Sequence, residues 1–285
     1  MIALVNPLDL PVRFSQLKAL GKSAAHYRYR LDHDLPQGPA LRIGRAGHLR
    51  CLGAWPDGED GESIVYEGSR RGKAWAAFRD EHPDADILTR AEWDVAGRIA
   101  DAVAACEVAS PFLRDAVKER HIAWEMAGRA CSSRPDAVGT WPDDIGGGTY
   151  LVDLKTCRDA SPRGFMRQAI SMGYHAQMDF YAEAIRHHTG ARPRDVYLIA
   201  VEVTAPHVVT TFRLEADALE LGARTWRAWW ETLRSCEQAS HWPGYATSVV
   251  PFPAPAWAGL ELDLGSDDEG EAERPELPSD EESAA

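Results

Sequence analysis

Three charged side chains have an order and a spacing that suit metal-dependent cleavage of a phosphodiester. Asp136 follows Pro135, and Asp153 and Lys155 come seventeen and nineteen positions after Asp136. Proline fixes its own φ and biases the preceding residue toward extended geometry, so Asp136 is expected where a strand meets a turn. Asp153 and Lys155 lie in the β-rich run 149–156, which follows three glycines. Side chains two apart in a strand share a face, so both can face one metal-bound phosphate.

These residue types together are suited to binding a divalent metal ion. Hard ions such as Mg²⁺, for which Mn²⁺ can substitute, take oxygen ligands from carboxylates, water and substrate phosphate. Asp136 and Asp153 are therefore predicted as metal ligands, and Glu125, in the apparent strand 121–127, as an additional ligand. The ammonium group of Lys155 can orient the attacking water and counter the charge that develops in the transition state. Taken singly, a Pro-Asp pair is usually a turn, and an Asp-Leu-Lys run a solvated strand edge.

With these residues in this order, the sequence resembles the PD-(D/E)XK nuclease superfamily. The stretch from about Glu125 to Tyr181 is similar to the RecB-like branch, and within it to the RecE-type (exonuclease VIII) phage and prophage exonucleases. The resemblance implies a restriction-endonuclease-like core. It also implies that the central catalytic residues are Glu125, Asp136, Asp153 and Lys155.

Two further motifs of that branch have counterparts in this chain. The QxxxY element maps onto Gln177 and Tyr181, which lie four positions apart and so share one helical face. The resemblance implies that they hold the DNA strand or orient the site; the alternative is a hydrogen bond between helix and sheet. A GxxxH-like pattern maps onto His48 and implies an auxiliary metal ligand, whereas a partly buried histidine without a metal is the alternative.

Apolar periodicity and turn residues predict an α/β fold, a central mixed β-sheet flanked by helices, with a helical N-terminal region. Three parts are expected: 1–120, the mainly helical N-terminal part of the nuclease domain; 121–258, the catalytic core with its closing helix; and 259–285, a disordered acidic tail. The expected helices are 15–29, 41–54, 68–81, 89–108, 164–188 and 216–238, and the expected strands are 121–128, 129–137, 149–156, 194–203 and 208–214.

The net charge of −13 is concentrated at the C-terminal end. From Glu261 onward there are eleven acidic residues and one arginine, which leaves a net charge of only −3 for residues 1–260. The tail is expected to aid solubility; the alternative is that it mimics DNA. Phosphate binding requires local rather than global positive charge. Basic groups occur at Lys18, Lys22, Arg28, Arg30, Arg42, Arg45, Arg50, Arg158, Arg163 and Arg167.

The five cysteines are scattered without a CxxC pair, which argues against a disulfide framework, a structural zinc ion and an iron–sulfur cluster. No run has the order of a signal peptide, and no apolar run is long enough to cross a bilayer. We therefore expect a cytoplasmic location without membrane association.

These features predict a Mg²⁺-dependent deoxyribonuclease. The resemblance implies an exonuclease that resects double-stranded DNA ends with 5′→3′ polarity, in recombination or phage DNA metabolism. It also implies a homo-oligomer and a single-strand-annealing protein as partner. One alternative is a RecB-like nuclease of another polarity, or an endonuclease. The other is a non-catalytic scaffold that binds DNA ends on the same fold.

Overall fold

The chain divides into two compact units, Met1–Tyr245 and Ala246–Ala285. The computed structural model describes residues 6–33, 38–53, 63–83 and 85–254. Every helix and strand among them belongs to the first unit, which holds both the N-terminal part and the predicted catalytic core. The predicted acidic tail, 259–285, lies outside the described residues. Within the described part of the chain, no helix combines the length and apolarity that a membrane span requires.

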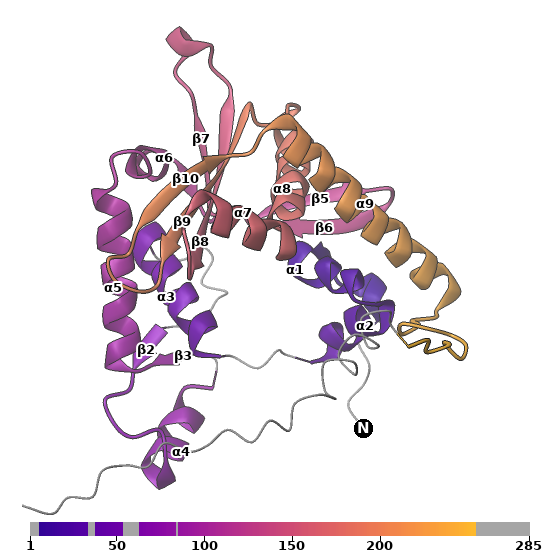
Figure 1. Cartoon of the computed structure of the whole chain (residues 1–285), viewed down its shortest axis with the longest axis horizontal. Coiled ribbons are helices and arrows are strands. Elements are labelled where there is room, and N and C mark those ends of the chain that lie inside the picture. Colours follow the sequence, from indigo (N-terminus) through magenta and orange to yellow (C-terminus); the bar gives the residue numbers. More distant parts are fainter. Residues whose placement is uncertain (1–5, 34–37, 54–62, 84, 255–285) are drawn as a thin grey trace, which may run out of the picture. The chain divides into compact units, whose positions relative to one another are not determined.

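A five-stranded mixed sheet forms the centre of the first unit (Figure 1). Its order is β10-β9-β8-β7-β4; β8 and β9 run parallel, and the other neighbouring pairs run antiparallel. The central strand β8 is buried on both faces. Its apolar residues Tyr150–Val152 are consecutive, which is typical of a strand that is covered on both sides. The mixed sheet confirms the predicted α/β class. The strands are β4 (Val117–Lys118), β7 (Ala137–Thr140), β8 (Thr149–Cys157), β9 (Asp195–Glu202) and β10 (Val209–Arg213).

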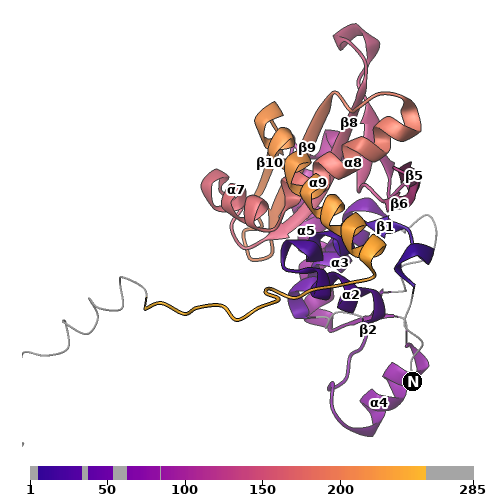
Figure 2. The same ribbon diagram turned by 90° about the vertical axis from the view of Figure 1, so that its right-hand side faces the viewer.

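Helices cover both faces of this sheet. On one face α3, α5 and α6 pack against Val152, Leu154 and Ile199; on the other, α7, α8 and α9 pack against Leu151 and Leu198. Figure 1 shows α5 and α9 on opposite sides of β8 and β9, and Figure 2 shows α8 and α9 in front of the sheet. The helices are α3 (Pro39–Leu52), α5 (Arg90–Ala105), α6 (Ser110–Arg114), α7 (Pro162–Ser171), α8 (Tyr174–Thr189) and α9 (Ala216–Ala239).

Two smaller sheets occur among the described residues of this unit. β1 pairs in parallel with β6, which pairs antiparallel with β5, so the N-terminal segment lies beside β6 with Arg13 opposite Ser132. β2 pairs in parallel with β3. The N-terminal region is therefore mainly helical, as predicted, but contains short strands that its sequence did not signal. The remaining elements are β1 (Val12–Arg13), β2 (Ser63–Val65), β3 (Asp86–Leu88), β5 (Ile122–Met126), β6 (Arg129–Ser133), α1 (Phe14–Leu17), α2 (Ala24–Asp32) and α4 (Gly72–Glu81), with 3₁₀ turns η1 (Pro7–Asp9), η2 (Lys18–Gly21) and η3 (Asp143–Ile145).

Three predicted elements are interrupted in the structure. The helix expected over 164–188 is two helices, because Gly173 adopts a left-handed φ of +71° between α7 and α8. The helix expected over 15–29 is divided into α1, η2 and α2, since Ser23 accepts the His26 N–H and caps a new helix. The strand expected over 129–137 ends at Ser133 as β6; a separate strand that was not expected, β7, begins at Ala137, and Asp136 lies in the gap.

We predict that Gly222→Ala destabilises the first unit. A Cβ atom at this position of α9 would lie 2.3 Å from the carbonyl oxygen of His175, a backbone atom of α8 that cannot move aside. Overpacking of this kind costs about 1–3 kcal/mol, which exceeds the gain in helix propensity. Thermal unfolding should show a melting temperature several degrees lower. Gly244→Ala, which adds its methyl group to open space, is the matched control. An unchanged melting temperature for Gly222→Ala would contradict the close packing of α8 on α9.

Candidate active site

Asp136 occupies the break between β6 and β7 and is buried there. Its Oδ2 accepts the backbone N–H of Leu154 at 2.6 Å, which ties the carboxylate to the central strand β8. In the pairing of β7 with β8, Ala137 lies opposite Val152. Asp136, which precedes Ala137, therefore lies close to Asp153, which follows Val152. Burial, followed by the negative charge of Asp153, raises the pKa of Asp136 to about 6, although His48 lowers it.

Asp153 and Lys155 point from β8 toward the α8 face of the sheet, as the alternation of side chains predicts. The Asp153 side chain is 1% exposed and forms an ion pair with the Lys155 ammonium. Burial opposes a charged lysine, but Asp153 and Asp136 outweigh burial and raise the Lys155 pKa. The ammonium also lies 4.7 Å from the centroid of the Tyr174 ring. Lys155 is therefore held as a cation beside two carboxylates.

His48 reaches the site because α3 approaches β8 closely. A Cβ at Gly44 would lie 3.1 Å from Thr156 Oγ1, and a Cβ at Gly47 would lie 3.7 Å from Thr156 Cγ2. A Cβ at Gly44 would require the Thr156 hydroxyl to shift by a few tenths of an ångström, so the approach of the helix to the strand is close. The resulting position brings His48 Nδ1 to 3.4 Å from Asp136 Oδ2.

Glu119 is the acidic residue that the sequence did not reveal. It has a φ of +53° and is buried, and its N–H donates to the Asp136 carbonyl oxygen at 3.0 Å. The potential ligand atoms of His48, Glu119 and Asp136 all lie within 4.8 Å of one another. In the sequence Glu119 stands between Lys118 and Arg120, and such a charged run is typical of a solvated turn. Only the left-handed turn after β4 directs it inward.

The structure does not bring Glu125 to this group. Glu125 lies on β5, opposite Ala130, in the three-stranded sheet rather than the central one. Its neighbour Trp124 packs against Phe180 in the core. Because successive side chains of a strand point to opposite faces, Glu125 points away from the core and is exposed to solvent. The expectation that Glu125 adds a carboxylate to the site is therefore corrected: the position is taken by Glu119.

Gln177 and Tyr181 lie one turn apart on α8 and line the same cleft as Asp136. Gln177 Nε2 donates to the Tyr181 hydroxyl at 3.0 Å, so the two side chains bond to each other. Burial and the charge of Asp153 raise the Tyr181 pKa. The phenol therefore stays protonated and keeps a hydrogen to donate near the carboxylates. The expected placement of both residues on one helical face toward the site agrees with this geometry.

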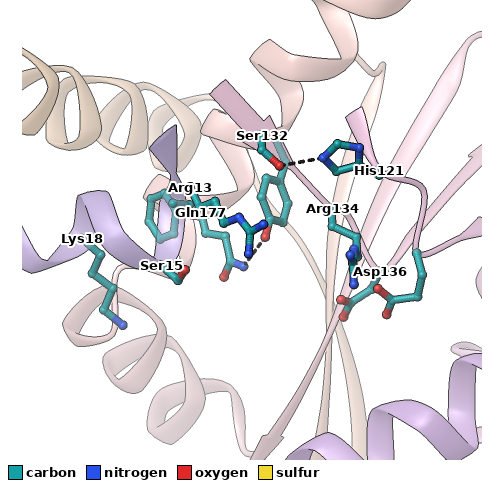
Figure 3. A pocket seen from close by; sticks show the side chains of 11 residues that line it. Arg13, Ser15, Lys18, His121, Ser132, Arg134, Asp136 and Gln177 are labelled. Carbon is teal, nitrogen blue, oxygen red and sulfur yellow. Dashed lines mark hydrogen bonds between the residues drawn. The ribbon is translucent and has the colours of Figure 1, made fainter. Parts of the chain in front are cut away.

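The cleft has a volume of about 320 Å³; Arg13 and Lys18 lie across it from Asp136, whereas Arg134 lies beside Asp136 (Figure 3). Arg13 and Lys18 come from the N-terminal segment, and Arg134 follows β6. Burial and the nearby charge of Lys155 lower the Lys18 pKa. His121 and Ser132 share a hydrogen bond of 2.8 Å on the same wall. The lining residues are Arg13, Phe14, Ser15, Lys18, Glu119, His121, Ser132, Arg134, Asp136, Gln177 and Tyr181.

The donor set fits a hard divalent cation. Carboxylate oxygens of Asp136 and Glu119 and an imidazole nitrogen of His48 converge, and Asp153 adds a third carboxylate, whose charge acts on Asp136. Adjacent buried carboxylates repel one another, so a bound cation would relieve an unfavourable interaction that the protein alone retains.

Comparisons with known proteins agree with this geometry. Residues 13–249 match the family described as a PDDEXK-like domain of unknown function, DUF3799. No curated protein matches the chain. The crystal structure of a "putative exonuclease" from Eubacterium rectale has a TM-score of 0.60 and 14% identity, covering 90% of this chain and 94% of that chain. At this identity the likeness shows a shared fold. The crystal structure of SSO0001 has 11% identity over 74% of this chain and 83% of that chain, but its TM-score of 0.26 supports no argument.

We predict a pH-dependent loss of stability that originates at Asp136. The pKa of Asp136 in the folded protein, about 6, lies above its ordinary value of 3.8. Between pH 3.8 and 6 the carboxyl group is therefore protonated in the folded protein but ionised in the unfolded chain. Protonation of Asp136 stabilises the folded protein at low pH, and this stabilisation is lost as the pH rises through 6. The contribution is on the order of 2–3 kcal/mol. Without divalent ions, wild type should therefore lose stability relative to Asp136→Asn between pH 4 and about 7.5 in denaturant titrations. Parallel pH profiles for the two proteins would contradict this assignment.

Proposed function

The chain belongs to the PDDEXK-like family DUF3799, and from this premise we propose that it is a divalent-metal-dependent deoxyribonuclease. One observation carries the proposal: Asp136, Asp153 and Lys155 converge in a buried site, together with His48 and Glu119. Two carboxylates and a cationic lysine in one water-poor site are the groups that phosphodiester hydrolysis requires.

In this proposal Asp136, Glu119 and His48 hold a Mg²⁺ ion, for which Mn²⁺ can substitute, and Asp153 contributes a further carboxylate. When bound, the metal polarises the scissile phosphate and lowers the pKa of coordinated water. Lys155, kept charged by Asp153, donates a hydrogen bond to the attacking water or to a phosphate oxygen and counters the developing negative charge. Gln177 and Tyr181 hold the strand with side-chain donors.

We further propose that the substrate is double-stranded DNA cleaved from an end. Arg13 and Lys18 give the cleft a positive wall for the backbone phosphates. The RecE-type resemblance supports 5′→3′ polarity, a recombination or phage context, a homo-oligomer and a single-strand-annealing partner. A cytoplasmic location follows from the same context.

Substrate topology tests the mode of cleavage. Linear duplex labelled at either the 5′ or the 3′ end, nicked circles and closed circles should be incubated with the protein and Mg²⁺. Degradation of linear duplex alone, with early release of the 5′ label, supports the exonuclease proposal. Cleavage of closed circles would replace it with an endonuclease, and binding of duplex ends without cleavage would favour a scaffold.

We predict that Glu119→Gln strongly reduces metal-dependent cleavage and that Glu125→Gln does not. The first substitution removes a charge from the converging ligand group, whereas the second alters an exposed side chain on another sheet. A ligand should contribute at least as much as an outer-sphere partner, whose loss costs about 10–100-fold in metal affinity or activity. Calorimetric Mn²⁺ titration and cleavage of linear duplex measure both effects. Full activity of Glu119→Gln with loss in Glu125→Gln would restore the original assignment.

We predict that Lys155→Ala lowers the single-turnover cleavage rate by roughly 100-fold while the metal still binds, because the ligands are provided by other residues. Lys155→Arg should rescue poorly, since a planar guanidinium cannot replace a compact ammonium between Asp153 and Tyr174. Melting temperatures of both variants serve as the control for folding. A cleavage rate equal to that of wild type would remove Lys155 from the proposed mechanism.

A further inference from the structure

A second hollow of about 250 Å³ lies on the other face of the central sheet, among α3, α5, α6 and β4. Three of its lining side chains are cationic, Arg50, Arg114 and Lys118, and the described lining contains no carboxylate. Ser110 adds a hydroxyl donor. The remaining lining residues are Cys51, Ala100, Val103, Ala104 and Leu113. We call this hollow the α3–α6 pocket.

The cations of the α3–α6 pocket differ from neighbouring arginines in lacking an acidic partner. On α3, Arg42 pairs with Glu92 at 2.7 Å and Arg45 pairs with Asp86 at 2.7 Å. Within the part of the chain that the structure describes, no acidic side chain forms an ion pair with Arg50, Arg114 or Lys118. In a chain with a net charge of −13, three clustered cations without an acidic partner form a local site of positive potential.

Arg50 is already positioned for a ligand. Its guanidinium carbon lies 4.7 Å from the centroid of the Trp93 ring. Gly97 of α5 leaves space for it, since a Cβ there would lie 3.4 Å from the same carbon. Stacking restricts the guanidinium while leaving its N–H groups available, so less conformational entropy is lost when an anion binds.

The α3–α6 pocket is built on the elements that hold the candidate active site. Arg50 follows His48 by two residues on α3. Lys118 directly precedes Glu119 and pairs with Ala137, the residue after Asp136. Burial and then Asp136 raise the pKa of Cys51, which lines the pocket, to about 12, whereas Lys118 and Arg50 lower it. The pocket and the carboxylate site are therefore within electrostatic range of one another.

We propose that the α3–α6 pocket is a second phosphate-binding site, which holds a backbone phosphate of the DNA outside the cleft that contains the scissile bond. This inference rests on the proposed function, because it identifies where the same substrate continues. Arginine presents paired N–H donors to phosphate oxygens, and each phosphate contact adds to the salt dependence of binding. With cations on both sides of the carboxylates, the DNA is held at two points and the bond to be cleaved lies between them.

The test is a DNA-binding measurement in the Asp153→Asn background, which prevents cleavage. Fluorescence anisotropy with labelled duplex compares this protein with the same protein carrying Arg114→Gln and Lys118→Gln. At about 0.1 M salt the added pair should weaken binding roughly 10-fold or more and reduce the slope of log K against log salt by about 2. In the cleaving background the pair should raise KM more than it lowers kcat.

The matched control is the pair Arg213→Gln and Arg224→Gln, which removes the same charge. These arginines are exposed and form ion pairs with Glu215 and Glu220. Binding by the control pair should equal that of the parent protein. An equal loss of DNA affinity in the two double variants would show that the effect comes from the change in net charge alone and would overturn the proposal. Arg50→Lys, which keeps the charge but loses the stacked guanidinium, should give an intermediate loss, and melting temperatures check folding.

Inorganic phosphate distinguishes a backbone site from a site for a free anion. If phosphate raises the melting temperature of the parent protein but not of the Arg114 and Lys118 variant, and DNA affinity is the same in both, the DNA assignment is overturned. If the unsubstituted protein binds DNA but does not cleave it, the nuclease proposal is refuted. If that binding is weakened by the Arg114 and Lys118 substitutions, the phosphate site is still supported. Cleavage that is independent of both residues would refute the phosphate site alone.

Discussion

The buried group of Asp136, Asp153 and Lys155 is the constraint around which the first unit is arranged. Two carboxylates in a medium of low polarity repel each other, and burial disfavours every charged form. The lysine offsets this by pairing with Asp153, and the Leu154 N–H offsets it by bonding to Asp136. The remaining repulsion is visible in the raised pKa of Asp136. Such an arrangement is costly for stability alone, and a polyvalent cation with an anionic substrate is its natural complement.

Close packing of backbone on backbone brings the remaining groups to these carboxylates. Gly44 and Gly47 let α3 lie against Thr156 of β8, which brings His48 to Asp136. Gly173 separates α7 from α8, so that α8 carries Gln177 and Tyr181 along the cleft. Both faces of the sheet therefore contribute to one site. The rigidity of these contacts suits a centre in which a small displacement has a large effect on the rate.

Charge is distributed in the chain in a way that suits a polyanionic substrate. Several arginines of the N-terminal part are neutralised by acidic side chains, for example Arg42 by Glu92. Arg50 and Lys118, which line the α3–α6 pocket, form no such pair among the described residues. The acidic residues that make the whole chain negative are concentrated in the C-terminal segment. Local potential rather than net charge is therefore the quantity relevant to the proposed DNA substrate.

Local rules were sufficient to determine much of this protein from its sequence. The alternation of β8 placed Asp153 and Lys155 on one face, and the four-residue spacing placed Gln177 and Tyr181 on one helical face, because both depend only on backbone geometry. The identity of the third acidic residue depended on tertiary structure. Glu119 points inward because it adopts a left-handed φ directly after β4, which pairs with β7. Glu125 points outward because its neighbour Trp124 packs in the core. Which residue of an alternating strand is buried depends on the opposing layer, and that layer comes from distant parts of the chain.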